Sequence, residues 1–281
     1  MNAARAAVRN EVRAALAIAR KDLQTLSRYK WSMFGLVFTP LYQGVIPAFL
    51  FGAAFAVGGR IVGLDTSIGT ENLSGFIFMG GVMAGLIATT FWFIAMSLRW
   101  EMDQGTLEPT WLTPTSHDTI LIGRTLYGLV IFLAGQVILF AVGIAFFDLH
   151  FSVDILFALP AMLVAVFAML GVAFLLAGIV LVLREANFFI DCTNFLFGVL
   201  SGVSFPITFL PGLVQPLALL LPTTYAMDLL RQQAIGARPL FDPTLEYVGL
   251  AVTTLLVFPL GRWAFARAER SMRIRGTLGQ Y

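Results

Sequence analysis

The residues best suited to polar chemistry lie in segment 99–124, RWEMDQGTLEPTWLTPTSHDTILIGR, which separates two long apolar runs. The segment has an arginine at each end, and Gly105, Pro109 and Pro114 lie between them. Its carboxylates are Glu101, Asp103, Glu108 and Asp118. Because charged side chains are costly to bury in hydrocarbon, this segment must be a water-facing loop with short helices. We expect it to face the cytoplasm and a partner protein.

Several kinds of catalytic and binding site are absent from the sequence. Lys21 and Lys30 are the two lysines, and neither follows a glycine, so a phosphate-binding loop of the G-x-x-x-x-G-K-[ST] type is missing. His117 and His150 lie far apart and Cys192 is the single cysteine, which leaves no zinc spacing and no internal disulfide. The net charge of +2 gives no basic field for nucleic acid. These absences argue against an enzyme, and we expect no cofactor on this chain.

Composition points to a membrane protein. The chain of 281 residues is 58% hydrophobic and only 12% charged, whereas soluble domains carry about 25% charged residues. A helix needs about 20 apolar residues to cross a bilayer. We therefore predict an all-α membrane protein with six transmembrane helices. The predicted spans are residues 33–57, 74–98, 125–147, 155–183, 188–206 and 245–265.

The amino-terminal segment predicts an amphipathic helix instead of a cleavable signal peptide, because charges occur throughout the first 30 residues. Within residues 11–30, apolar side chains recur at spacings of three and four, which places them on one helical face. These residues are Val12, Leu16, Ala19, Leu23 and Leu26. We expect this helix to lie flat in the membrane interface; the alternative is a solvated helix that packs on another subunit.

The distribution of basic residues predicts the orientation. Of the 18 lysines and arginines, all but Arg60, Arg231 and Arg238 fall in segments 1–32, 99–124 and 262–281 or at position 184. Cytoplasmic segments beside spans are enriched in these residues. With six spans, this bias places both termini and segment 99–124 in the cytoplasm.

Residues 206–244 are too apolar for a solvated loop and too rich in proline for a straight span. Irregular backbone at membrane depth must be covered by protein or line a water cavity. We predict two short re-entrant helices over residues 206–235, the second capped at Thr223 or Thr224. The alternative is a loosely ordered external hairpin. Asp228 and Arg231 either pair along the second helix or form a weak surface pair.

Three polar residues within apolar runs are candidates for a transport pathway. Asp191 is a proton or cation site, a solvated residue one turn from Asn187, or a partner for Arg184. Gln43 and Gln136 either face a pathway or hydrogen-bond to neighbouring helices.

Two motifs then indicate a family. Glu101 is followed by Gly105-Thr106-Leu107-Glu108 and by Leu112-Thr113-Pro114, and Pro222-Thr223-Thr224-Tyr225 is followed by Arg231. With the predicted topology, these motifs make the chain resemble, over nearly all of residues 1–281, the membrane subunit of ABC-2 type ABC exporters. Pro109-Thr110 departs from the family pattern, in which helix-forming apolar residues more often follow the glutamate, and so leaves the helix boundary in this loop open.

The resemblance implies a plasma (inner) membrane subunit that works as a homodimer or with a related permease. Two separate ABC ATPase subunits would bind ATP and Mg and receive the short helix near residues 105–113. The residues it implies for ATPase coupling are Glu101, Gly105, Thr106, Leu107, Glu108, Trp111 and Pro114. Those it implies for an outer gate are Pro222, Tyr225 and Arg231. Trp111 is expected to be an interface anchor or to lie among lipid headgroups.

Two functions of other classes stay open. An ion-driven secondary transporter needs polar groups near the membrane midplane and often has internal repeats; Asp191 is the one acidic candidate, and no convincing repeat is visible. A non-transporting membrane scaffold would not need the broken helices predicted for residues 206–235. For a transporter, lipids, glycans, drugs and similar amphiphiles all fit the sequence.

Overall fold

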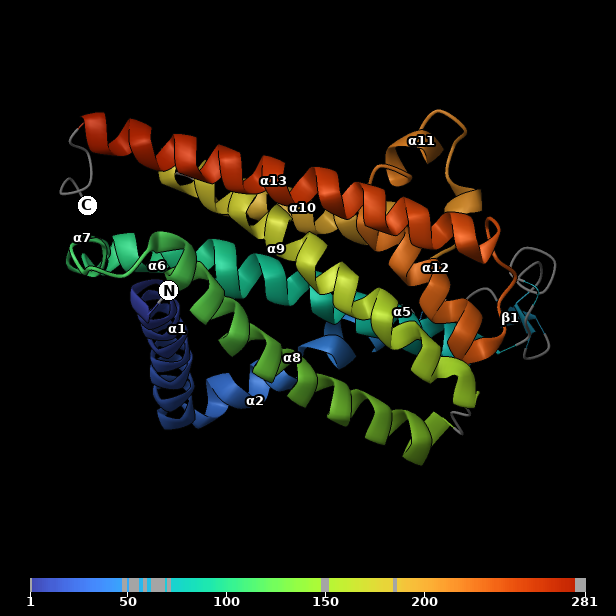
Figure 1. Cartoon of the computed structure of the whole chain (residues 1–281). Helices are drawn as coiled ribbons and strands as arrows, with labels where there is room; N and C mark the ends of the chain where they lie inside the picture. Colours follow the sequence, from blue (N-terminus) through green and yellow to red (C-terminus); the bar gives the residue numbers. More distant parts are fainter. Residues whose placement is uncertain are drawn as a thin grey trace.

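The computed structural model describes residues 2–46, 50, 56–57, 60–61, 69, 72–147, 152–183 and 186–275. These residues form a bundle of long helices that run roughly alongside one another (Figure 1). One end of the bundle holds the end of α13 (Pro243–Arg275), the start of α8 (His117–Phe147) and the turn between α6 (Met96–Asp103) and α7 (Leu107–Trp111). The other end holds α12 (Pro222–Ile235) and a short antiparallel pair of strands.

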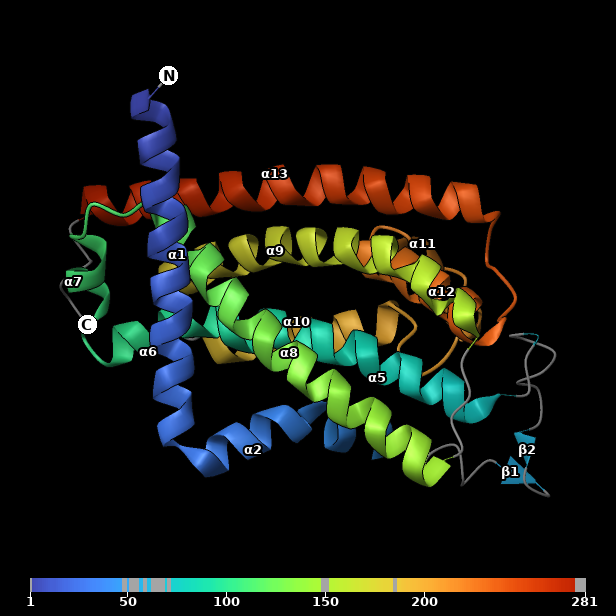
Figure 2. The same ribbon diagram turned by 60° about the horizontal axis from the view of Figure 1, so that its bottom comes forward.

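The helices and strands of the first half begin with α1 (Asn2–Arg28), which runs across the long helices (Figure 2). They continue with α2 (Lys30–Thr39), the π-helical segment η1 (Pro40–Val45), and the antiparallel pair β1 (Ala56–Val57) and β2 (Arg60–Ile61). Then follow α5 (Leu73–Thr89), the π-helical segment η2 (Thr90–Ala95), α6 (Met96–Asp103), α7 (Leu107–Trp111) and α8 (His117–Phe147).

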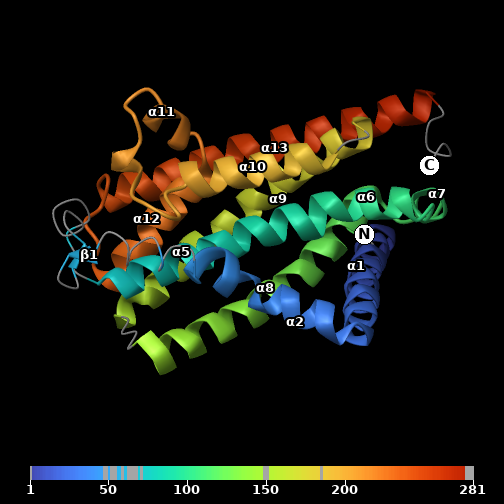
Figure 3. The ribbon, with the colours of Figure 1, turned by 180° about the vertical axis from the view of Figure 1, so that it is seen from behind.

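The second half begins with η3 (Val153–Ala158), α9 (Leu159–Val182) and α10 (Ala186–Leu200). Three short elements, η4 (Ile207–Phe209), α11 (Gln215–Ala218) and α12 (Pro222–Ile235), lead to the last helix, α13 (Pro243–Arg275). Seen from behind, α2 and η1 lie against the same side of the bundle as α5 (Figure 3).

Four described stretches are long and apolar enough to cross a membrane: Ser74–Asp103, His117–Phe146, Asp154–Val182 and Pro243–Ile274. Helix α10 has 15 residues, which extend about 22 Å, less than the hydrocarbon core. The predicted first span, 33–57, lies partly outside the described residues. Six spans therefore stay a prediction.

The boundaries predicted around segment 99–124 are wrong in detail. The second span continues as helix through Asp103, and the third begins at His117 instead of 125. The reason is local chemistry: charges at these helix ends are paired, and Ser116 caps α8, its Oγ accepting a hydrogen bond from the Thr119 N–H at 3.2 Å. The amino-terminal helix likewise begins at Asn2, well before residue 11.

Helix α1 buries part of the predicted stripe. Ala19 and Leu26 are buried, together with Ala15, and Leu23 is half-buried, whereas Val12 and Leu16 are 55% and 56% exposed. The buried face packs on α8, which approaches closely enough that a side chain on its Gly123 would contact the Ala15 carbonyl oxygen. Small residues permit this approach, and the exposed apolar residues are left for lipid or another subunit.

The capping predicted for the second short helix is wrong. Helix α12 begins at Pro222, and Leu221 occupies the cap position without a side-chain hydrogen bond. Proline suits the first helical position because its ring fixes a helical φ. An N–H at that position would have no acceptor within the helix, so proline loses nothing by lacking one. Thr224 lies inside the first turn, where its Oγ1 donates to the Ala218 carbonyl at 2.6 Å. The re-entrant placement of α11 and α12 stays a prediction.

The bundle depends on a close crossing of α9 and α13. A Cβ on Gly261 of α13 would overlap the carbonyl oxygen of Gly171 on α9. Both helices are apolar here, so backbone approach and side-chain packing, not polar pairs, hold them together.

We expect Gly261→Ala to separate α9 from α13 and to lower the free energy of unfolding by about 1–3 kcal/mol, the cost of overpacking. Gly35→Ala is the matched control, because nothing lies within 4 Å of that position, and a helical alanine there should be neutral or stabilising. Thermal unfolding of the detergent-purified variants measures both. Equal midpoints for the two variants would show that the crossing is not tight.

Candidate functional site

The turn after α6 is built on Gly105. Its φ of 66° lies in the left-handed region, which glycine adopts at little cost. The Thr106 N–H donates to the Glu101 carbonyl at 2.9 Å and the Gly105 N–H to the Met102 carbonyl at 3.0 Å. This pair of bonds is a Schellman motif, which ends a helix and turns the chain sharply. We call residues 103–116, from the last residue of α6 to the cap of α8, the elbow.

Helix α7 has an inner and an outer face. Leu107 and Trp111 are buried, and the Trp111 ring lies 4.4 Å from the His117 ring, centroid to centroid. Glu108 is exposed, and Leu112 is 80% exposed. Sequence analysis left Trp111 as either an interface anchor or a residue among lipid headgroups. In the structure Trp111 is buried and holds α7 in place from inside, and Leu112 is the exposed apolar side chain.

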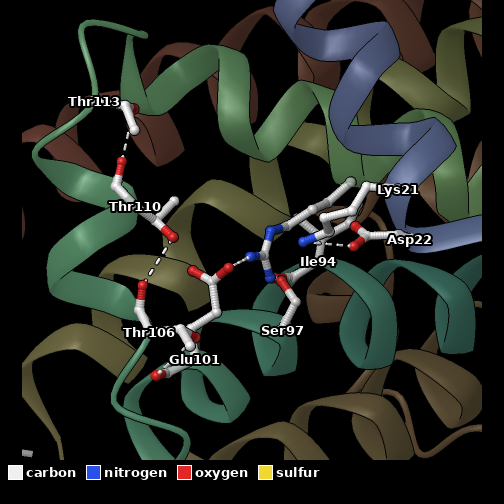
Figure 4. Close-up of polar contacts among 9 residues, drawn as sticks. Lys21, Asp22, Ile94, Ser97, Glu101, Thr106, Thr110 and Thr113 are labelled. Carbon is white, nitrogen blue, oxygen red and sulfur yellow. Dashed lines mark hydrogen bonds and ion pairs between the residues drawn. The ribbon is translucent and has the colours of Figure 1, made fainter. Parts of the chain in front are cut away.

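Three threonines stiffen the elbow. The Thr110 hydroxyl donates to the Thr106 carbonyl at 2.8 Å, and the Thr113 hydroxyl donates to the Thr110 carbonyl at 2.7 Å (Figure 4). Pro114 follows as an exposed residue. These local bonds give a five-residue helix more order than its length alone would support.

A buried ion pair fixes the elbow to the bundle. Glu101 of α6 pairs with Arg124 of α8, and their side chains are only 12% and 6% exposed. Figure 4 shows Glu101 near Lys21 and Asp22 of α1, which pair with each other at 2.9 Å. The sequence reasoning assigned the Glu101 charge to a partner protein, but the structure directs it inward, to Arg124.

A second set of ion pairs ties the carboxyl-terminal helix to the elbow. His117 Nδ1 lies 2.9 Å from Glu269 of α13, and Glu269 also pairs with Arg273 at 2.7 Å. One residue on, Asp118 pairs with Arg262 of α13 at 2.8 Å. The two long helices are thus joined at the base of the elbow.

The amino-terminal helix reaches the same place. The Ser116 N–H and Oγ lie 3.4 and 3.2 Å from the Glu11 carboxylate. Hydrogen bonds from Thr119 and Ser116 hold the pKa of Glu11 below its usual value. Sequence reasoning missed Arg124, His117 and Glu11 as members of this cluster, because residues this far apart in the chain give no local signal of contact.

The predicted gate residues lie at the other end and are tightly bonded. Arg231 is buried and donates to the carbonyls of Gly202 at 2.7 Å and Val203 at 2.9 Å. Its guanidinium lies 3.4 Å from the centroid of the Phe76 ring. The Tyr225 hydroxyl donates to a backbone carbonyl at 2.9 Å, and Pro222 begins α12. The segment 206–235 is therefore well bonded, which argues against a loose hairpin.

The predicted pairing of Asp228 with Arg231 does not form. Asp228 accepts hydrogen bonds from the Gln232 side chain at 2.8 Å and the Leu240 N–H at 3.0 Å. Glu246 of α13, which the sequence reasoning missed, is fully buried and accepts from the Phe241 N–H at 3.0 Å. The sequence signal that could have identified Glu246 is its position as an acidic residue at the start of a long apolar segment.

The three polar candidates within apolar runs are not equivalent. Gln136 is buried in α8, whereas Asp191 is exposed on α10. Gln43 belongs to η1, but its side chain lies outside what the structure describes. Among the described residues, no group of three His, Cys, Asp or Glu side chains is placed to hold a metal ion.

A family model for the ABC-2 type transporter matches residues 13–234, from α1 to the end of α12. The chain belongs to the ABC-2 type transporter family. A search of curated proteins found no match. The protein is thus a multi-pass membrane protein and the transmembrane component of an ABC-type transporter, in which ATPase activity lies in a separate subunit. The match includes the elbow and the bonded segment around Arg231.

The Glu101–Arg124 pair gives a direct test of how the elbow is held. We expect Glu101→Ala to lower the free energy of unfolding by about 3–5 kcal/mol, because it leaves the buried Arg124 unpaired. Asp103→Ala is the control: its pair with Arg99 at 3.1 Å is about half exposed, so we expect a loss of at most about 1 kcal/mol.

Thermal unfolding of the purified variants measures the difference. The double variant Glu101→Leu/Arg124→Met should recover most of the stability, since apolar pairs often replace buried ion pairs without loss. Equal losses for Glu101→Ala and Asp103→Ala would contradict a buried, structural pair.

Proposed function

We propose that this chain is the membrane-spanning permease subunit of an ATP-driven exporter, and that the outer face of the elbow docks onto an ATPase subunit. One observation carries the proposal. Helix α7 is fixed from inside by Leu107 and Trp111 while Glu108 and Leu112 stay exposed on its outer face. An exposed apolar side chain beside a carboxylate, on a rigid turn, suits insertion into a groove lined by apolar and basic groups.

Force transmission supports this role. A partner can move the spans only through a rigid contact. The elbow is bonded to α1 through Ser116 and Glu11, and it is flanked by the Glu101–Arg124 pair, which joins α6 to α8, and the His117–Glu269 pair, which joins α8 to α13. ATP and Mg would bind to the partner subunits. Closure of those subunits around nucleotide would push the elbow and tilt the long helices together.

The same arrangement supports an orientation in the membrane. We propose six spans, with both termini and the elbow in the cytoplasm and the protein in the plasma (inner) membrane. The elbow, α1 and the end of α13 lie at one end of the bundle (Figure 1), where the basic residues also gather. Two copies, or one copy and a related permease, would enclose the pathway.

At the opposite end, we propose that α11 and α12 form the outer gate. Arg231 holds α12 to the end of α10 through the Gly202 and Val203 carbonyls. For the pathway to open, movement of the long helices would either break these hydrogen bonds or move α12 and the end of α10 together. The transported molecule would be a lipid, glycan, drug or similar amphiphile.

Substitutions on the outer face of α7 test the coupling. We expect Leu112→Arg and Glu108→Arg to weaken ATPase binding by about 2 kcal/mol, roughly 30-fold, and to abolish export, because each removes a contact at the centre of the docking surface. Neither residue is buried, so membrane insertion and thermal stability should not change. Gly105→Val should likewise uncouple hydrolysis from export, by straining the left-handed turn.

The measurement is co-purification with a co-expressed candidate ABC ATPase subunit, followed by hydrolysis and transport in lipid nanodiscs. Leu213→Arg is the matched control, because Leu213 is 92% exposed and precedes α11 at the other end. The coupling role fails if the α7 variants transport as the unaltered protein does, or if Leu213→Arg loses ATPase binding equally.

A further inference from the structure

Two carboxyl groups meet where α12 packs on the start of α13. Asp228 Oδ2 and Glu246 Oε2 both accept hydrogen bonds from the Gln232 side-chain nitrogen, at 2.8 and 2.5 Å. The two oxygens therefore lie no more than about 5 Å apart, a separation at which two negative charges oppose each other's ionisation. Gln232 thus holds together two groups that would repel each other if both were ionised.

The surroundings do not neutralise two negative charges. Glu246 is fully buried, and its other oxygen accepts a hydrogen bond from the Phe241 N–H at 3.0 Å. Arg231, on the same helix as Asp228, directs its guanidinium to two backbone carbonyls instead. Among the residues that the structure describes, neither carboxyl group takes part in an ion pair. Because a buried carboxylate without a counter-charge is costly, a proton shared by the two groups satisfies both of them.

Other titratable groups near the pair have partners of their own or are exposed. On the described elements around it, these groups are Tyr225, Arg231, Arg238, Asp154, Asp242 and Tyr247. Arg238 is exposed, and with Asp228 it lines a cavity of about 30 Å³. A cavity of this size holds a water molecule, so water can carry a proton to and from the pair.

The shared proton makes the contact between α12 and α13 depend on pH. In the unfolded chain both carboxyl groups are ionised above about pH 5, whereas the folded pair keeps one proton. The folded state then binds more protons than the unfolded state, so stability falls as the pH rises, until the folded pair also loses its proton. Beyond that point two adjacent carboxylates repel each other, with one amide between them.

We propose that Asp228 and Glu246 form a proton-dependent latch, which holds α12 to the start of α13 while they share a proton and releases the two helices when they lose it. In the proposed orientation the latch lies on the outer side, so acid there would hold the outer gate closed. That gating role rests on the proposed function, whereas the latch belongs to the chain itself. A test on the purified protein, without ATPase or transport, distinguishes failure of one from failure of the other.

Thermal unfolding of the detergent-purified protein tests the shared proton. Between about pH 5 and about pH 9, we expect the midpoint to fall by about 4 °C for each unit of pH while the folded pair keeps its proton. Asp228→Asn should remove most of this fall, because an amide at this position donates to Glu246 at every pH. Glu246→Gln repeats the test from the other side of the pair if Asp228→Asn does not fold.

Asp242→Asn is the matched control. Asp242 is an exposed carboxyl group at the start of the same helix, where it accepts a hydrogen bond from the Thr244 N–H at 2.9 Å. This variant should keep the full fall with pH. All the variants retain the His117–Glu269 pair at the other end of the bundle, so differences between them report on the latch.

Spin labels test whether the two helices separate. They are attached at Gln233→Cys on α12 and Val248→Cys on α13, in a Cys192→Ser background, and the distance between them is measured by double electron–electron resonance. We expect this distance to lengthen across the same pH range in the otherwise unaltered protein, and to stay constant when Asp228→Asn is added.

Two results would overturn the proposal. One is an Asp228→Asn or Glu246→Gln variant that loses stability with pH as steeply as the unaltered protein, which would place the responsible proton elsewhere. The other is a label distance that does not change with pH, which would mean that the pair stabilises the fold without releasing α12.

Discussion

The buried pair of Glu101 and Arg124 sets the shape of the polar end of this protein. Two charges at the edge of an apolar bundle are stable there only if they meet, and their meeting fixes the end of α6 against the start of α8. Beyond Glu101 the chain leaves α6 through a sharp turn at the left-handed Gly105, and it returns to Arg124 through α7 and the first turns of α8. The outer face of α7 is exposed because Leu107 and Trp111 bury its other face.

The same principle appears at the other end. Arg231 donates hydrogen bonds to two backbone carbonyls and lies over an aromatic ring. The acidic residues Asp228 and Glu246 accept hydrogen bonds from an amide side chain and from backbone N–H groups. Polar groups in this bundle are thus concentrated at two ends, each tightly bonded, with helices packed through glycines between them. Such an arrangement can transmit a rigid-body movement from one end to the other.

Much of this could be predicted from the sequence. Composition and apolar runs gave the membrane class and the approximate positions of the long helices, and the motif at Gly105 located the elbow. The helix ends were misplaced because residues such as Glu101 and Asp118 look like loop residues until their partners, Arg124 and Arg262, are known. Those partners come from distant positions, which periodicity cannot reveal. The burial of Trp111 could not be predicted for the same reason: it depends on contact with His117 and on the packing of α7.

The side of the membrane on which the elbow lies is the most direct test of the account. A Leu112→Cys variant in a Cys192→Ser background carries one reactive thiol. The native Leu112 is 80% exposed. The account predicts that a membrane-impermeant maleimide labels it in inside-out vesicles and not in right-side-out vesicles. Labelling from the outer side of right-side-out vesicles would contradict the account, because no cytoplasmic ATPase could then reach the elbow.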